Sequence, residues 1–214
     1  MATPQYTSLG GMEKSSFFYT KIALIVERLE DHESLPELQP TGSYDSDLAE
    51  EISETETVDL FMPIGVKDTD AAAAVKAGIL LWNDDLKMSH EICQGLETIE
   101  GSYWHGIMHR REGDFSNAKH WFAKVVDHPV YQKMFDNAAT LAEEIIPATD
   151  QLKFHSSAMQ RVGKWSPEGF VDWCESAAND SVDKACEYFF KKLQIEEIRL
   201  LIDHSYQLSI GYGY

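Results

Sequence analysis

Long apolar stretches are missing from this sequence. The longest apolar run covers only residues 77–82 of the 214, whereas a membrane-spanning helix needs roughly 20 apolar residues. The first residues, MATPQYTSLGGMEKSS, also lack the basic start and apolar core of a secretory signal peptide. We therefore expect a cytoplasmic protein without a membrane segment.

Basic residues are scarce as well. Lys and Arg number 18 against 36 acidic residues, and the formal net charge is −18. A chain of this charge repels phosphates, which argues against binding to nucleic acid and to anionic membrane surfaces. A protein or a small molecule remains open as the partner. The charge is uneven, because residues 30–59 contain eleven acids and no Lys or Arg.

Cysteine is the third scarce residue type, with only Cys93, Cys174 and Cys186 in the chain. An odd number at wide spacing forms neither a disulfide framework nor a zinc-binding motif. Each of the three lies in a stretch that is predicted to be helical. We interpret them as buried or inactive thiols.

Composition divides the chain into four parts. Residues 1–29 form an N-terminal extension in which apolar residues at helical spacing, Phe17–Leu29, predict one helix. Residues 30–66 combine the acidic excess with Pro, Gly, Ser and Thr, which is typical of a flexible linker. Residues 67–210 form the predicted helical domain, and residues 211–214 form a short C-terminal tail.

The predicted domain opens with four helical runs that form two copies of one unit. The first pair is AAAAVKAGILLW and LKMSHEICQGLETI, and the second pair is YWHGIMHRRE and NAKHWFAKVV. An offset of 29 residues aligns Ala77 with Gly106 and Ser89 with Ala118. Small residues in mid-helix let two helices approach closely, which favours an antiparallel helical hairpin.

The second half of the domain also reads as helical. Helices are predicted over residues 131–146, 182–192 and 194–209, while residues 151–163 are ambiguous. Another helix starts with Ser166 as its N-cap and Pro167 at its first position. No segment shows the period-two alternation of a strand. The sequence therefore predicts an all-α fold of antiparallel helical hairpins, packed in a bundle or in a short tetratricopeptide-like array.

The second hairpin resembles a tetratricopeptide unit. Its segment WHGIMHRREGDFSNAKHWFAKVVDHP has a small residue in the middle of the first helix, a Gly-Asp-aromatic turn, then Ala and an aromatic residue in the second helix, and Pro after it. The period of 29 is shorter than the roughly 34 residues of that family. This difference favours a diverged helical hairpin over a repeat array.

Three longer segments resemble a more specific family. They are SHEICQ, YWHGIMHRREGDFSNAKHWF and WSPEGFVDWCE. They look like the "AHe.aQ … WHa.lHR.EGD..NA.yW" signature of a family of small uncharacterised helical proteins found in bacteria and fungi. The chain departs from it with Ser89 in place of Ala and His120 in place of Tyr. The resemblance implies a fold over residues 70–210, and it implies no activity.

The histidines of the second hairpin could bind a metal ion. His105 and His109 are four residues apart, so they share one face of a helix, and two imidazoles at that spacing can ligate one divalent metal. Glu112 lies within reach of the same face, and His90 on the neighbouring helix could complete the site. The alternative is that these histidines bond to carbonyls or stack on Trp104 and Trp121.

The same helix carries two arginines that could bind an anionic ligand. Arg110 and Arg111 can each hold a carboxylate or phosphate through two hydrogen bonds. With Glu112 and Asp114 close by, the alternative is an internal salt-bridge network at the hairpin turn. As candidate ligand-binding residues we name Trp104, Arg110, Arg111, Glu112, Asn117 and His120.

Two hypotheses about function follow. The chain has no GxSxG nucleophile elbow and no GxxxxGK[ST] or GxGxxG phosphate loop. One hypothesis is a ligand- or protein-binding module, with an exposed groove lined by Arg110, His120 or their neighbours. The other is a metal-dependent hydrolase or lyase in which His90, His105 and His109 hold the ion and Glu112 or Glu91 acts as acid or base.

Overall fold

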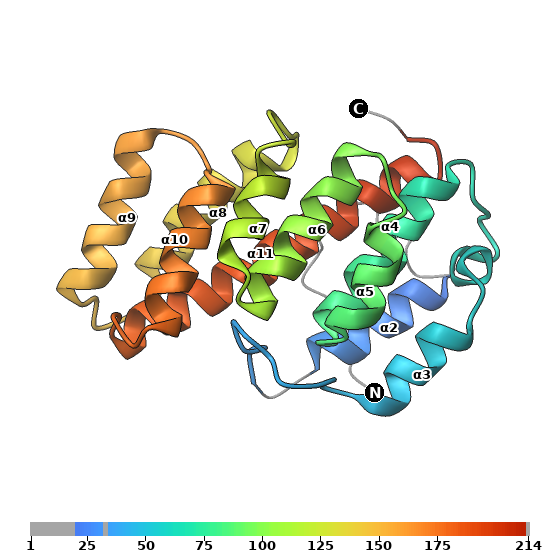
Figure 1. The fold of residues 1–214 in the computed structure, drawn as a ribbon, viewed down its shortest axis with the longest axis horizontal. Helices are drawn as coiled ribbons and strands as arrows, with labels where there is room; N and C mark the ends of the chain where they lie inside the picture. The colour runs from blue at the N-terminus through green and yellow to red at the C-terminus, as the bar shows by residue number, and fades with distance from the viewer. Residues whose placement is uncertain (1–19, 32–33, 213–214) are drawn as a thin grey trace, which may run out of the picture.

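The computed structural model describes residues 20–31 and 34–212. In this part of the chain it has ten α-helices, one short 3-10 helix and no strand, so the predicted all-α fold is confirmed (Figure 1). None of these helices combines the length and the apolar composition that crossing a bilayer requires. In chain order the elements are α2 (Lys21–Glu30), α3 (Ser46–Glu54), η1 (Thr57–Phe61), α4 (Thr69–Trp82), α5 (Leu86–Cys93), α6 (Ile99–Glu112), α7 (Phe115–Phe122), α8 (Val130–Glu143), α9 (Asp150–Val162), α10 (Pro167–Ala178) and α11 (Lys184–Ser209).

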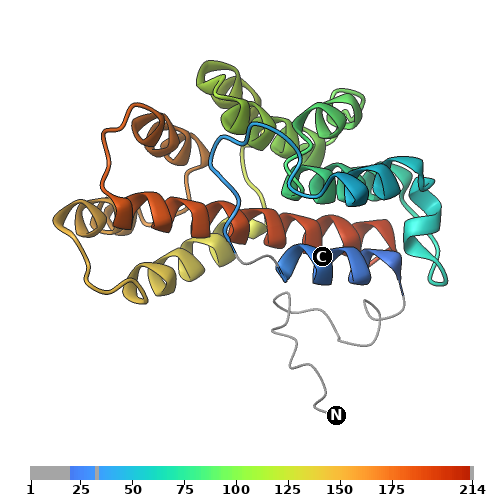
Figure 2. The same cartoon turned by 90° about the horizontal axis from the view of Figure 1, so that it is seen from below.

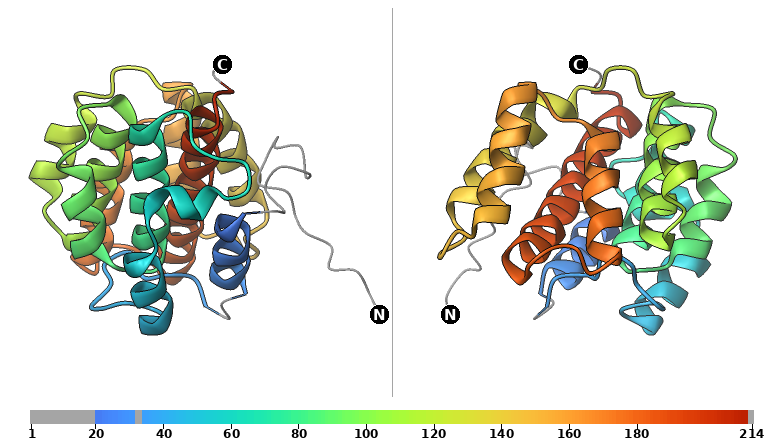
Figure 3. Two further views of the ribbon diagram at one scale, coloured as in Figure 1. Left: turned by 90° about the vertical axis from the view of Figure 1, so that its right-hand side faces the viewer. Right: turned by 60° about the vertical axis from the view of Figure 1, so that its left-hand side comes forward.

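The C-terminal helix α11 is the central element. It packs against α4, α8, α9 and α10. Helices α2 and α8 lie on one side of it, and α6 and α7 lie on the other (Figures 2 and 3). The sequence suggests two helices here, but α11 continues through Leu193, which is fully buried. Burial on several faces explains why its pattern is not that of a simple amphipathic helix.

The two predicted hairpins are present as α4–α5 and α6–α7, and their turns have the same backbone conformation. Asp84 and Gly113 both adopt the left-handed region, with φ of 65° and 87°. The next residues, Asp85 and Asp114, have φ and ψ of −86° and 67° against −87° and 70°. Left-handed backbone suits glycine; at Asp84 it is accompanied by a buried ion pair with Arg111.

Small residues allow the helices of these hairpins to approach closely, as predicted. A Cβ atom added to Gly106 of α6 would lie 2.8 Å from Cε1 of Phe122 in α7. The same holds at Gly78 of α4, where an added Cβ would lie 2.5 Å from Cζ2 of Trp104. The ring of Trp104 therefore fills the space between α4 and α6, and the side chain is completely buried.

The prediction of a flexible linker over residues 30–66 is wrong for residues 34–66. This segment forms α3 and η1, which pack against α4. It contributes Leu48, Ile52, Leu60 and Phe61 to the core, each at most 1% exposed. Leu48 and Ile52 are one helical turn apart and face inwards, while the acidic residues between them face solvent. The acidic composition concealed an amphipathic helix.

The N-terminal helix is also part of the same core. The prediction placed it at residues 17–29, and the structure has α2 at Lys21–Glu30, with residues 17–19 outside the described part. Its buried face, Ile22, Ile25, Val26 and Leu29, packs against η1 and α4. The three cysteines are buried, as predicted. The described residues therefore share one hydrophobic core rather than an extension, a linker and a domain.

Candidate metal centre

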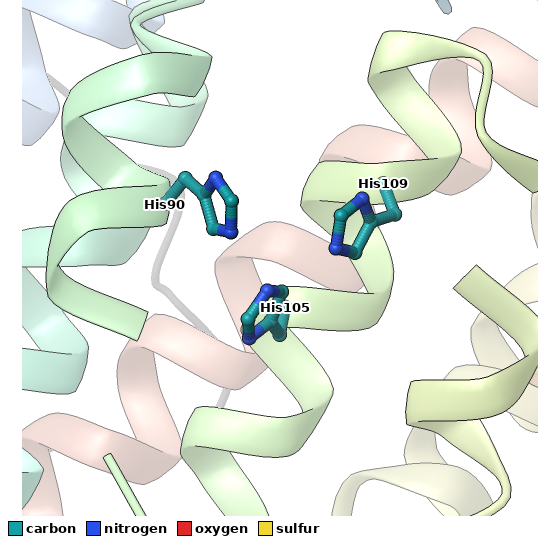
Figure 4. Close-up of side chains that lie close together, drawn as sticks. All are labelled: His90, His105 and His109. Carbon is teal, nitrogen blue, oxygen red and sulfur yellow. The ribbon is translucent and has the colours of Figure 1, made fainter. Parts of the chain in front are cut away.

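Helix α6 places two histidines one turn apart on the face that meets α5. The helix begins at the N-cap Thr98, whose Oγ1 accepts a hydrogen bond from the Gly101 N–H at 3.0 Å. It ends at Gly113, whose left-handed conformation closes the last turn. His105 and His109 project from α6, and His90 projects towards them from α5 (Figure 4). The hairpin packing that the sequence predicts therefore brings the three histidines together.

The three imidazole rings form a compact cluster. One ring nitrogen from each histidine can be chosen so that all three lie within 4.8 Å of one another. The rings of His105 and His109 are stacked, with centroids 4.8 Å apart. The ring of His90 meets both edge-on, at 4.7 Å from His105 and 5.4 Å from His109. Of the three, His105 and His109 are buried and His90 is half-buried.

Two neighbours orient the ring of His109. Its Nδ1 lies 3.1 Å from Oε1 of Glu112, three residues further along α6. Its Nε2 lies 3.0 Å from Nδ2 of Asn117, in α7. If Nδ1 carries the proton and donates it to Glu112, the lone pair of Nε2 accepts the hydrogen bond from Asn117, and Nε2 binds a metal only when that bond is given up. A carboxylate on the far nitrogen is the usual arrangement around a metal-bound histidine.

The ring of His105 is held by an aromatic side chain that the sequence offers as a stacking partner. The indole of Trp121 in α7 stacks on it, with centroids 3.8 Å apart and planes 12° apart. Trp121 is half-buried, and Nζ of Lys124 lies 3.4 Å from its ring centroid. Only the possibility of stacking was foreseeable, because the distance depends on how α7 packs against α6.

Electrostatics keeps His105 in the form that binds metals. Burial, together with the neighbouring His109 and His90, lowers the pKa of His105 to about 4. The imidazole is therefore neutral at pH 7, and a neutral imidazole is the metal-binding form. Protons do not compete with an ion at this ligand above about pH 5.

The two arginines of α6 do not reach the surface, which corrects their place among the ligand-binding candidates. Arg110 is fully buried, with Nη2 2.7 Å from Oε2 of Glu197 in α11. Its guanidinium also lies over the ring of Phe170, 4.4 Å from the centroid. Arg111 is fully buried as well and pairs with Asp84.

The interpretation of these arginines as internal ion pairs is therefore right, but the partners suggested for them are wrong. Glu112 and Asp114 are both exposed. Helix geometry explains the difference, because Arg110 and Arg111 point to the faces packed on α11 and α4. Their carboxylate partners come from those elements and not from the hairpin turn.

The remaining candidates divide between the cluster and other places. Asn117 and Glu112 lie at the cluster, in contact with His109. Trp104 is buried between α4 and α6 and contributes to packing. His120 is exposed, and its ring lies 6.0 Å from that of Trp121. Three of the six ligand-binding candidates thus lack access to solvent: Trp104, Arg110 and Arg111.

Comparison of the chain with family models, with curated proteins and with solved structures found no match.

Proposed function

We propose that this protein binds one divalent transition-metal ion through His90, His105 and His109, and that it is a metal-dependent hydrolase or lyase. One observation carries the proposal: the three imidazoles each offer a ring nitrogen, and these three nitrogens lie within 4.8 Å of one another. Around a tetrahedral ion with bonds of about 2.0–2.1 Å, ligand nitrogens are separated by about 3.3 Å. Small rotations of the side chains suffice to reach that spacing.

The ligand set selects the class of ion. Imidazole nitrogens favour Zn²⁺, Co²⁺, Ni²⁺ and Cu²⁺, whereas Mg²⁺ and Ca²⁺ favour oxygen ligands. Three protein ligands leave the fourth position of a tetrahedral ion open, as in catalytic rather than structural zinc sites. An ion held in this way lowers the pKa of a bound water to about 7 and so supplies hydroxide at neutral pH.

The carboxylates near the cluster differ in the roles they can take. Glu112 contacts Nδ1 of His109, which suits orientation of that ligand better than proton transfer. Asp114 accepts the N–H of Asn117 and caps α7, and one of its carboxylate oxygens lies within 4.8 Å of a ring nitrogen of His109 and of a carboxylate oxygen of Glu112. Glu91 is exposed beside Lys87, at 4.0 Å. Asp114 is therefore the best-placed general base.

The competing hypothesis, a ligand- or protein-binding module, has less support. It expects an exposed groove lined by Arg110, His120 or their neighbours, and of these two residues His120 is exposed whereas Arg110 is 1% exposed. Both arginines already have carboxylate partners inside the protein. The metal hypothesis required that the three histidines be close together, and they are.

The first test is metal content. Purified, tag-free protein is reconstituted with Zn²⁺ or Co²⁺, dialysed, and analysed by elemental mass spectrometry. We expect the loss of one ion per chain in His90→Asn, which changes a half-buried side chain with little risk to the fold. His120→Asn is the matched control, because His120 is exposed and outside the cluster. Equal metal content in the wild type and in His90→Asn would refute the site.

The second test separates catalysis from binding. An activated ester and a phosphodiester are offered to the metal-loaded wild type, to the chelator-treated protein and to Asp114→Asn. Hydrolysis that requires the ion and falls at least about tenfold in Asp114→Asn supports the hydrolase, in keeping with the usual contribution of a general base. An ion bound at the histidines without any turnover of these substrates would overturn the hydrolytic part alone.

A further inference from the structure

A second cluster of metal-ligating side chains lies at the other end of α6. Glu100 belongs to the first turn of that helix, His128 directly precedes α8, and His204 lies near the end of α11. The chain separates Glu100 from His204 by 104 residues, so no sequence motif joins them. Packing of α6 and α8 with α11 brings them to one place.

The ligand atoms of this second cluster lie close together. Oε1 of Glu100 lies 3.3 Å from Nε2 of His204 and 3.8 Å from Nε2 of His128. The ligand atoms of all three lie within 4.8 Å of one another. Both measured separations are close to the roughly 3.3 Å that ligands keep around a tetrahedral ion.

One nitrogen of this cluster has an unfulfilled bonding capacity. Nε2 of His128 makes no hydrogen bond within the described structure, although the side chain is only 1% exposed. A buried polar atom of this kind requires an explanation. The nitrogen faces Glu100 and His204, where an ion would lie.

The protonation states also suit a metal ion. Burial lowers the pKa of His128 to about 4, so its ring is neutral at pH 7. The hydrogen bond with His204 lowers the pKa of Glu100, so its carboxylate is charged. Metal ligands must have these forms. Nδ1 of His128 accepts the Val130 N–H at 3.3 Å, a long bond that is lost when Nε2 binds an ion and the proton moves to Nδ1.

We propose that Glu100, His128 and His204 form a second divalent-metal site, with two imidazole nitrogens and one carboxylate oxygen as ligands. The carboxylate makes it a harder site than the three-histidine cluster, suited to Mn²⁺ and Fe²⁺ as well as to Zn²⁺ and Co²⁺. An ion bound there connects three parts of the chain: helix α6, helix α11 and the segment that directly precedes α8. This inference does not depend on the proposed function, because the two sites share no residue.

A surface pocket lies beside this site. It is lined by Asp127, His128, Pro129, Tyr131, Gln132 and Lys164. His128 is the one residue of the cluster that lines it, and its side chain is 1% exposed.

The experiment counts Co²⁺ ions per chain by equilibrium dialysis and follows the visible absorption of Co²⁺, whose intensity reports its coordination. Glu100→Gln removes the carboxylate ligand with almost no change in shape. Glu97→Gln is the matched control, since it removes an exposed carboxylate just before the same helix. We expect Glu100→Gln to bind one ion fewer than the wild type, or to bind it at least about tenfold more weakly. Glu97→Gln should equal the wild type.

The number of ions bound per chain distinguishes the second site from the first. If both sites exist, the wild type binds two ions, and His90→Asn and Glu100→Gln bind one each. If only the second site exists, the wild type and His90→Asn bind one ion and Glu100→Gln binds none. Equal numbers and affinities in Glu100→Gln and the wild type would overturn the second site. Far-UV circular dichroism in chelator checks that each variant is folded.

Discussion

Removing the negative charge of Glu197 should destabilise the protein strongly. Its carboxylate is completely buried between α11 and α6, where it pairs with Arg110 and accepts a hydrogen bond from the Tyr103 hydroxyl at 3.0 Å. In Glu197→Gln the amide oxygen can still accept the Tyr103 bond. The charge of Arg110 then loses this counterion while the side chain stays fully buried.

The expected magnitude follows from this burial. Both side chains of the pair are 0% exposed, and breaking such a pair from one side costs about 3–5 kcal/mol. For a chain of this size each kcal/mol lowers the melting temperature by about 2–4 °C. The free energy of unfolding should therefore fall by about 3–5 kcal/mol and the melting temperature by about 6–20 °C.

Urea unfolding followed by circular dichroism measures this change, with Asp172→Asn as the matched control. Asp172 pairs with Lys119 at 2.5 Å, but both are well exposed, so its loss should cost less than about 1 kcal/mol. The double variant Arg110→Met/Glu197→Leu should recover most of the stability, because it leaves no buried charge. A cost for Glu197→Gln as small as that of Asp172→Asn would refute the reasoning.

Three further changes test other parts of the fold. Gly106→Ala should cost about 1–3 kcal/mol in urea unfolding, because the new Cβ meets the Phe122 ring, whereas Gly42→Ala, with nothing within 4 Å, should change little; equal effects would contradict the close packing. Ser166→Ala should cost about 1 kcal/mol, and Ser166→Gly only a few tenths, because its hydroxyl caps α10 by accepting the Gly169 N–H. Burial lowers the pKa of His128 to about 4. Between about pH 6.5 and pH 4, His128 is therefore protonated in the unfolded chain but neutral in the folded protein. In chelator, the wild type should therefore lose up to roughly 3 kcal/mol relative to His128→Gln as the pH falls through this range, and a pH-independent difference would contradict the assignment.

Local features of the fold could be predicted because they depend on residues close together in the chain. Ser166 was predicted as an N-cap and has that role in α10. A Gly-Asp-aromatic turn was predicted after the first helix of the second hairpin, and the left-handed backbone of Gly113 ends α6 there. A cap or a turn requires only a few consecutive residues in suitable conformations. Tertiary packing did not have to be known.

The first histidine cluster could be predicted from the sequence for a related reason. His105 and His109 share a face because the helical period places every fourth residue there. His90 joins them because α5 and α6 are consecutive and antiparallel, and consecutive elements usually pack together. The aromatic support from Trp121 was less accessible, since it depends on the packing of α7.

Composition misled where it concealed periodicity. The segment around Leu48 and Ile52 has so many acidic residues that it resembles a linker, yet its apolar residues recur at helical spacing. Burial of that narrow apolar face against α4 holds the segment in place. The average composition of a segment does not reveal an apolar face that covers only one side of a short helix.

The sequence by itself determined the helices of the two hairpins, the N-cap of α10, the hairpin repeat and the shared face of His105 and His109, because short-range backbone geometry sets all of them. Only the tertiary structure decided that Glu197 neutralises Arg110 and that Glu100, His128 and His204 meet. Those partners are far apart in the chain, and α11 brings them together by packing through the centre of the molecule. Contacts of this kind depend on the relative placement of whole helices, which no local pattern specifies.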